Sequence, residues 1–223
     1  MKKFGIIILA LWLVGFVAAP ASAATIDLVQ YAFNIDGTFS NITLGDPLPA
    51  GVTLGGFDDL SGLGSIIVTI SDAGLHYVGL FVDHEIDEPI NTFFNEFGSV
   101  NGAPAAGQSW EIDEPGFVFG DIYDNITAGS LDNSNGVPAS FPDDVSMAMA
   151  WGFSGSAVVS FLVSETAPAS GFYLSQTDPD SGATIYFSSS LSPDGGEVPE
   201  PSTILLIGTG LVGLVGFRRK FRE

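Results

Sequence analysis

The chain has 223 residues and no cysteine, and it carries 26 acidic residues against only 6 basic ones. Its formal net charge of −20 excludes nucleic acid and anionic membrane surfaces as partners of the acidic part. The lack of cysteine excludes disulfides, thiol catalysis and thiolate metal sites, so a hydrophobic core has to hold the fold.

The N-terminus has the features of a secretory signal peptide. Two lysines precede the uncharged apolar run 4–18, and small residues follow it up to Ala23. We therefore predict a signal peptide over residues 1–23, cleaved after Ala23 by signal peptidase. An uncleaved anchor helix is the alternative, but the run is short for a membrane span and Pro20 follows it.

The next segment, residues 24–191, is predicted to be one acidic all-β domain. Gly, Ser, Asn and Asp are abundant, and apolar residues alternate with period two. The pattern predicts a first strand over 26–33 and three hairpins, formed by 65–71 with 75–83, 145–153 with 157–163, and 171–176 with 183–187. About nine or ten such strands at short spacing predict an antiparallel β-sandwich or jelly roll.

Within this domain, one strand is distinctive and helices are scarce. Over 145–153, bulky apolar residues alternate with small ones, so we expect this strand to lie between two layers. No segment has a convincing helical period, although residues 90–97 are predicted to form one short turn of helix. Residues 98–107 and 129–144 are predicted to be long surface loops.

The densest acidic cluster is Asp83-His84-Glu85-Ile86-Asp87-Glu88. On a strand, Asp83, Glu85 and Asp87 would share one face, and in a bend they could converge on one cation. Carboxylates without competing Lys or Arg favour Ca²⁺ over Zn²⁺, so these three residues are the candidate calcium ligands. The alternative is a solvated acidic edge strand that discourages aggregation.

Other acidic groups are interpreted first as turn residues and only second as cation ligands. They are Asp58-Asp59, Asp121 with Asp124, Asp143-Asp144, and the turn Asp178-Pro179-Asp180-Ser181-Gly182.

Trp110-Glu111-Ile112-Asp113 is similar to the E-I-D core of jelly-roll glycosidases. That resemblance implies a further Glu on the same strand face, but Glu114 falls on the opposite face and Pro115 ends the strand. We therefore expect no catalytic residues and no enzyme activity. Trp110, beside acidic residues and a Gly-rich loop, is the best candidate for an exposed ring that stacks on a ligand.

The C-terminus has three features in order. After a flexible stalk predicted over 192–198 come Pro199-Glu200-Pro201, an uncharged run over 203–217 and a basic cluster. Fifteen residues rise only about 22 Å as a helix, whereas the hydrocarbon core of a bilayer is roughly 30 Å thick. We expect this transmembrane helix to hold the chain only temporarily.

The segment 199–223 resembles the PEP-CTERM sorting signal. The resemblance implies recognition by an exosortase, a membrane enzyme of Gram-negative bacteria, with processing at Pro199, Glu200 and Pro201. An ordinary tail anchor is the alternative.

The same resemblance implies export through an inner-membrane intermediate to the cell surface, outer membrane or extracellular matrix. It further implies association with exopolysaccharide or biofilm, but nothing about the chemistry of the acidic domain. We therefore expect a non-enzymatic structural or interaction protein. A Ca²⁺-dependent carbohydrate-binding module is the alternative, and a glycoside-active enzyme is a third, less favoured reading. Ca²⁺ is the one candidate cofactor.

Overall fold

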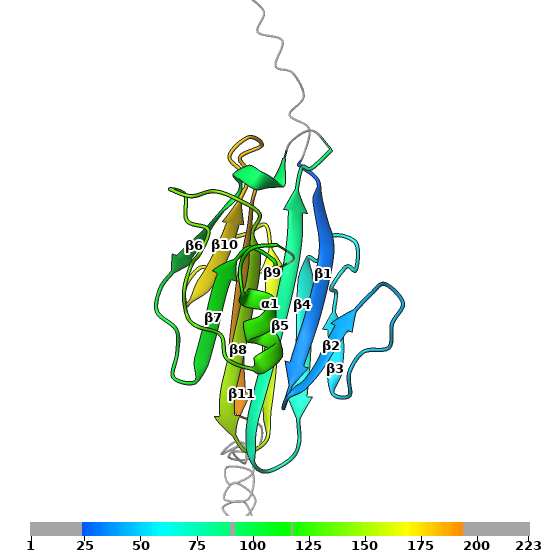
Figure 1. Cartoon of the computed structure of the whole chain (residues 1–223). Helices are drawn as coiled ribbons and strands as arrows, with labels where there is room; N and C mark the ends of the chain where they lie inside the picture. The colour runs from blue at the N-terminus through cyan, green and yellow to red at the C-terminus, as the bar shows by residue number, and fades with distance from the viewer. Residues whose placement is uncertain (1–23, 90–91, 117, 194–223) are drawn as a thin grey trace, which may run out of the picture.

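In the computed structural model, the described residues are 24–89, 92–116 and 118–193. They form two antiparallel sheets packed face to face (Figure 1), which confirms the all-β prediction. The sheets hold eleven strands, in the orders β2-β1-β5-β8-β7 and β3-β4-β9-β11-β10-β6. No helix within these residues is long and apolar enough to span a membrane. The predicted signal peptide and sorting segment lie outside the described residues.

The elements have the following bounds. The five-stranded sheet contains β1 (Ile26–Ile35), β2 (Thr38–Ile42), β5 (Leu75–Ile86), β7 (Gln108–Asp113) and β8 (Ser146–Ser154). The six-stranded sheet contains β3 (Val52–Gly55), β4 (Gly64–Ile70), β6 (Phe97–Asn101), β9 (Ala157–Ser164), β10 (Tyr173–Thr177) and β11 (Thr184–Pro193). A 3-10 helix, η1 (Phe93–Asn95), and an α-helix, α1 (Ile122–Ala128), complete the fold. Strand β11 runs two residues into the predicted stalk.

The core lies between the two sheets and is formed by alternate residues of their strands. In β5 these are Val78, Leu80 and Val82, and they face Ile66 and Val68 of β4. All five side chains are almost completely buried. Burial of each such side chain contributes roughly 1.5–3 kcal/mol relative to exposure, so a core of such residues can stabilise the fold without disulfides.

Two of the three predicted hairpins are wrong, because their strands belong to different sheets. Strand β4 pairs with β3 and β9, whereas β5 pairs with β1 and β8; β8 and β9 are separated in the same way. The two strands of each wrongly predicted hairpin bury their apolar faces in the same core. They therefore face each other across the core, in different sheets, and do not hydrogen-bond to each other. The two crossing turns are joined by a hydrogen bond from Gly155 N to Gly74 O of 2.8 Å. The hairpin of β10 with β11 is confirmed.

The outer face of the five-stranded sheet is partly covered by α1, a helix that the sequence did not predict. Ile122 and Ile126 of α1 pack on the small residues Ala148 and Ala150 of β8. Strand β8 therefore does lie between two layers, as expected from its alternating large and small side chains. The Asn34 amide fixes the end of the helix by donating hydrogen bonds to the carbonyls of its last turn.

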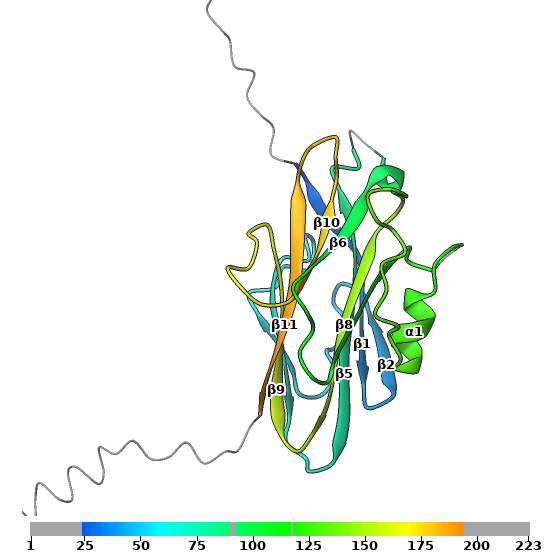
Figure 2. The same ribbon diagram turned by 90° about the vertical axis from the view of Figure 1, so that its left-hand side faces the viewer.

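The sandwich has two distinct ends, which we call the arch pole and the acidic pole. The arch pole contains the crossing turns, and Pro193, the last residue of β11, pairs there with Ala157. The acidic pole lies at the far end of β5 and contains residues 83–88 (Figure 1). Twelve residues of extended strand separate the two poles, a length of about 40 Å. Figure 2 shows β11 ending at the arch pole.

Candidate functional site

The three predicted calcium ligands lie at the acidic pole, but they face different surroundings. Asp83 and Glu85 project from β5 onto the outer face of its sheet, and they are only 2% and 9% exposed. Asp87 follows the end of the strand with a φ of 62°, and its carboxylate accepts a hydrogen bond of 3.3 Å from Thr25 N. The shared face of Asp83 and Glu85 is as expected, and calcium binding by the three stays a prediction.

Two further carboxylates join Asp83 and Glu85 to form what we call the buried acid cluster. These are Glu96, which follows η1, and Asp144, which precedes β8. Glu96 is fully buried; Ile86 N donates to its Oε1 at 3.0 Å, and Gln176 Nε2 donates to its Oε2. No Lys or Arg lies between residues 4 and 217, so no lysine or arginine of the domain can neutralise this cluster.

Burial and mutual repulsion shift the proton affinities of the cluster upward. Burial raises the pKa of Glu85 to about 9 and that of Glu96 to about 8, and nearby Asp144 adds to both shifts. The pKa of Asp144 rises to about 6 for the same reason, and that of Asp83 lies well above its ordinary value. Glu85 and Glu96 therefore favour their protonated forms at neutral pH, whereas Asp144 favours the ionised form.

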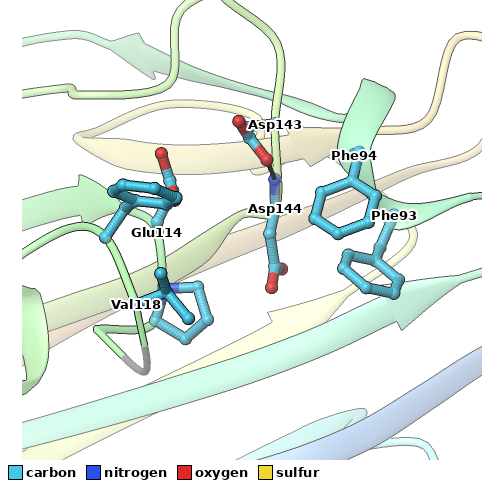
Figure 3. Close-up of a pocket in the computed structure, with 8 residues that line it drawn as sticks. Phe93, Phe94, Glu114, Val118, Asp143 and Asp144 are labelled. Carbon is cyan, nitrogen blue, oxygen red and sulfur yellow. Dashed lines mark hydrogen bonds between the residues drawn. The ribbon is translucent and has the colours of Figure 1, made fainter.

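Beside the buried acid cluster lies a cavity of about 430 Å³, which we call the polar-end pocket (Figure 3). Three segments far apart in the sequence line it: η1, the loop after β7, and the residues before β8. Its lining residues are Phe93, Phe94, Glu114, Pro115, Val118, Phe119, Asp143 and Asp144. The pocket thus combines aromatic walls with carboxylates.

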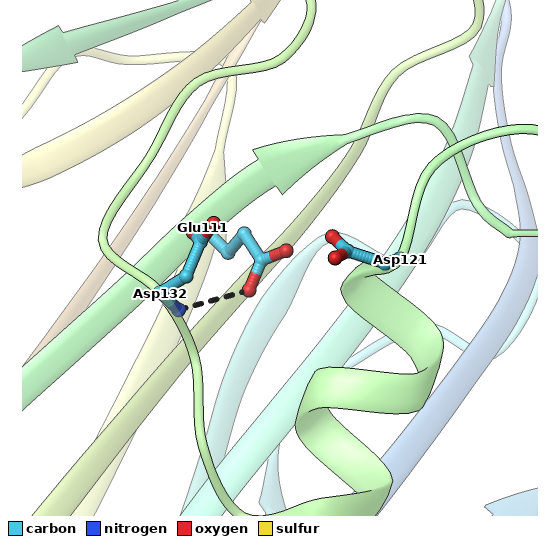
Figure 4. A group of neighbouring side chains, drawn as sticks. All are labelled: Glu111, Asp121 and Asp132. Atoms are coloured by element: carbon cyan, nitrogen blue, oxygen red, sulfur yellow. Dashed lines mark hydrogen bonds between the residues drawn. The ribbon is translucent and has the colours of Figure 1, made fainter.

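A second carboxylate group lies further along the outer face, beside α1. Glu111, Asp121 and Asp132 each bring one oxygen within 4.8 Å of the others, and within the described part of the chain no other set of three does so. Glu111 is fully buried on β7, whereas Asp121 and Asp132 are exposed on loops (Figure 4). Oxygen atoms at such separations suit Ca²⁺, which binds its ligands at about 2.3–2.6 Å.

Hydrogen bonds hold the Glu111 carboxylate in place between the other two. Asn125 Nδ2 donates to Glu111 Oε1 at 3.0 Å, and Asp132 N donates to Oε2 at 3.2 Å. Burial raises the pKa of Glu111 to about 7, against the lowering effect of these two bonds. The sequence pointed to Glu111 and Asp121 separately but not to Asp132, because only the folded loop after α1 brings Asp132 to β7.

The geometry around the glycosidase-like segment agrees with the reasons for expecting no catalysis. Strand β7 ends at Asp113, whose Oδ2 accepts a hydrogen bond from Asp121 N at 2.9 Å. Glu114 leaves the strand and lines the polar-end pocket. The absence of enzyme activity nevertheless stays a prediction.

Trp110 is not the exposed ring that the sequence suggested. It belongs to the inward-facing set of β7, is partly buried against the core, and lies 5.9 Å from the ring of Phe172 between centroids. At the acidic pole, the adjacent rings of Phe93 and Phe94 in η1 line the pocket instead.

The comparisons with known proteins concern the tail alone. Residues 197–220 match the model of the PEP-CTERM protein-sorting motif. The chain carries a PEP-CTERM sorting motif. This PEP-CTERM protein is accordingly exported through the membrane of a Gram-negative bacterium and sorted by an exosortase. No curated protein and no solved structure matches the chain, so the β-sandwich has to be interpreted from its own residues.

Proposed function

We propose that the β-sandwich of this PEP-CTERM protein is a non-enzymatic interaction domain of the cell surface or extracellular matrix, associated with exopolysaccharide. One observation carries the proposal: an exported domain without Lys or Arg crowds partly buried carboxylates on one sheet face and at one pole. Unpaired buried charge is costly, so such a surface is suited to receiving positive charge from outside. The sorting motif supports delivery of this surface to the cell exterior.

A Ca²⁺-dependent form of this function is favoured by the group Glu111, Asp121 and Asp132. Their oxygens converge in the structure without any change of backbone, and Glu111 is fully buried. A bound Ca²⁺ would remove the repulsion among the three carboxylates and could hold the loop after α1 against β7. The carboxylates of an acidic polysaccharide would complete the coordination of the same ion.

The test is thermal unfolding of the exported protein in EDTA, in millimolar Ca²⁺ and in Mg²⁺ at matched ionic strength. Ca²⁺ at a hundred times its Kd stabilises by about 2.7 kcal/mol, which raises Tm by roughly 5–10 °C for a domain of this size. Asp121→Asn should abolish the Ca²⁺-specific rise, whereas Asp124→Asn, an exposed neighbour on α1, should keep it. Equal Tm values in all three solutions would count against the calcium-dependent form.

Binding to the glycan is measured separately, by co-sedimentation of the protein with exopolysaccharide from a Gram-negative biofilm. Retention in the polysaccharide pellet supports the proposed association. Failure to sediment with it, both with and without Ca²⁺, would refute it.

A further inference from the structure

Strongly exposed apolar side chains form the walls of the polar-end pocket. Phe94, Val118 and Phe119 are 60%, 79% and 67% exposed, and all three line this one cavity. Phe93 packs beside Phe94 with its ring centroid 4.1 Å away. Clustered exposed apolar residues around a cavity are typical of a surface that is covered by a partner.

The floor of the pocket is acidic. Asp143, Asp144 and Glu114 contribute carboxylates, and Asp143 Oδ1 accepts a hydrogen bond of 2.9 Å from Asp144 N (Figure 3). These groups lie among phenylalanine rings, whose faces attract cations. A ligand of this pocket therefore has to be both positively charged and partly apolar.

An unpaired buried group lies next to this floor. Asp83 is 2% exposed, its Oδ1 has no hydrogen-bond partner within the described residues, and after burial the charge of Asp144 contributes most to raising its pKa. A positive charge bound at Asp144 would offset the repulsion that Asp144 exerts on Asp83.

The domain has no side chain of its own to supply that charge. Its histidines are His76, which pairs with Asp36 on another part of the molecule, and His84. His84 lies on β5 beside Asp83 but faces the core, and burial lowers its pKa to about 4, so it is neutral at physiological pH. The cation has to come from another molecule.

The arrangement of the carboxylates distinguishes a metal ion from an organic cation. A metal ion needs three or more oxygens that converge, and among the described residues such convergence occurs at Glu111, Asp121 and Asp132, not in this pocket. Separated carboxylates and phenylalanine walls instead suit a side chain with an apolar stem and a charged end. Lys has four methylene groups below its ammonium, and the planar guanidinium of Arg stacks on aromatic rings.

We propose that the polar-end pocket receives a Lys or Arg side chain of a partner protein, with its stem between Phe93, Phe94 and Phe119 and its charge at Asp144 and Glu114. The pocket lies at the pole opposite the one where β11 ends at Pro193. This inference does not rest on the glycan association or on the Ca²⁺ group.

The test is an NMR titration of the full chain, in detergent, with three capped tripeptides that differ in the central residue. The peptides are Gly-Lys-Gly, Gly-Arg-Gly and Gly-norleucine-Gly, the last having the stem of Lys without its charge. The Lys and Arg peptides are expected to bind at least about tenfold more tightly than the norleucine peptide, and their binding should weaken as salt is added.

Variants locate the binding. Asp144→Asn and Phe94→Ala should each reduce the affinity for the Lys peptide about tenfold, and Phe94 is exposed enough for the fold to tolerate its loss. Two controls should bind as the wild type does: Asp124→Asn, an exposed acidic residue on α1, and Leu75→Ala, an apolar residue 88% exposed at the arch pole. If either pocket variant unfolds, Glu114→Gln tests the same carboxylate floor.

Three results would overturn the proposal. Equal binding of the norleucine peptide would make the pocket a plain apolar groove, and no binding of any peptide would leave it without this role. Tighter binding of glucosamine than of the Lys peptide would assign the pocket to an amino sugar instead. The melting experiments with Ca²⁺ are unaffected by any of these results, so the two proposals fail separately.

Discussion

Replacing Glu85 by Gln is expected to stabilise the domain at pH 8 and to leave its stability nearly unchanged at pH 4.5. Glu85 is 9% exposed, and its Oε2 has no hydrogen-bond partner within the described residues, so the amide loses little. The pKa of Glu85 rises from 4.5 to about 9 on folding. The folded protein therefore binds this proton more tightly than the unfolded chain, and its stability falls as pH rises from about 4.5 to about 9.

The size of the effect follows from that pKa difference. Each pH unit between the two pKa values costs about 1.4 kcal/mol, which gives an upper bound of about 5 kcal/mol at pH 8. Asp83, Glu96 and Asp144 share part of the repulsion, and relaxation at the end of the sheet lowers the cost further. We expect Glu85→Gln to gain about 2 kcal/mol at pH 8, a rise in Tm of roughly 4–8 °C.

The assay is thermal unfolding followed by circular dichroism at pH 4.5, 6 and 8 and constant ionic strength. Glu165→Gln is the matched control, because it removes the same charge from an exposed position after β9. The difference in Tm between Glu85→Gln and wild type should widen with pH, while the control stays close to wild type. A difference that does not change from pH 4.5 to 8 would refute the burial argument.

Two further substitutions test local packing and pairing. Gly62→Ala should lower the free energy of unfolding by about 3 kcal/mol, because the added Cβ would lie 2.2 Å from Nε2 of buried His84. Gly182→Ala is the control: its φ is similar but no atom lies near the added Cβ, so it should cost only about 1 kcal/mol. Urea unfolding measures both values. His76→Gln should lower Tm more at pH 5 than at pH 8. The hydrogen bond from His76 to Asp36 raises the pKa of His76 above 6.5, so this stabilisation is present below pH 6.5 and is lost as pH rises through the raised value. An equal loss of Tm at both pH values would contradict the pairing.

The sequence predicts the layered architecture well, because burial in a sandwich imposes period two on each strand. In β8 the alternation of bulky Met147 and Met149 with small Ala148 and Ala150 correctly predicts a strand between two layers. It does not distinguish a hairpin from a crossing between sheets, because a short Gly-containing turn serves either connection. Helix α1 is also missed: seven residues are too few to have a periodic signal or to be stable without the sheet below them.

The candidate sites are less predictable than the fold, because each depends on contacts between distant segments. The local spacing of Asp83 and Glu85 placed both on one face, but their neighbours Glu96 and Asp144 come from elsewhere in the chain. Asp132 reaches Glu111 only through a loop whose path is set by hydrogen bonds to β7. Trp110 shows the opposite error, since nearby acidic residues suggested exposure while its strand position faces inward.

The position of β11 has a mechanical consequence for any force applied through the C-terminal end of the domain. The sorting motif begins at residue 197, four residues after β11 ends, and β11 lies between β9 and β10 in the interior of its sheet. The hydrogen bonds of an antiparallel ladder are perpendicular to the strands, so a pull along β11 loads in shear all the bonds that tie it to its neighbours. Tension applied at the end of β11 is therefore resisted by whole ladders together, and it cannot open them one bond at a time.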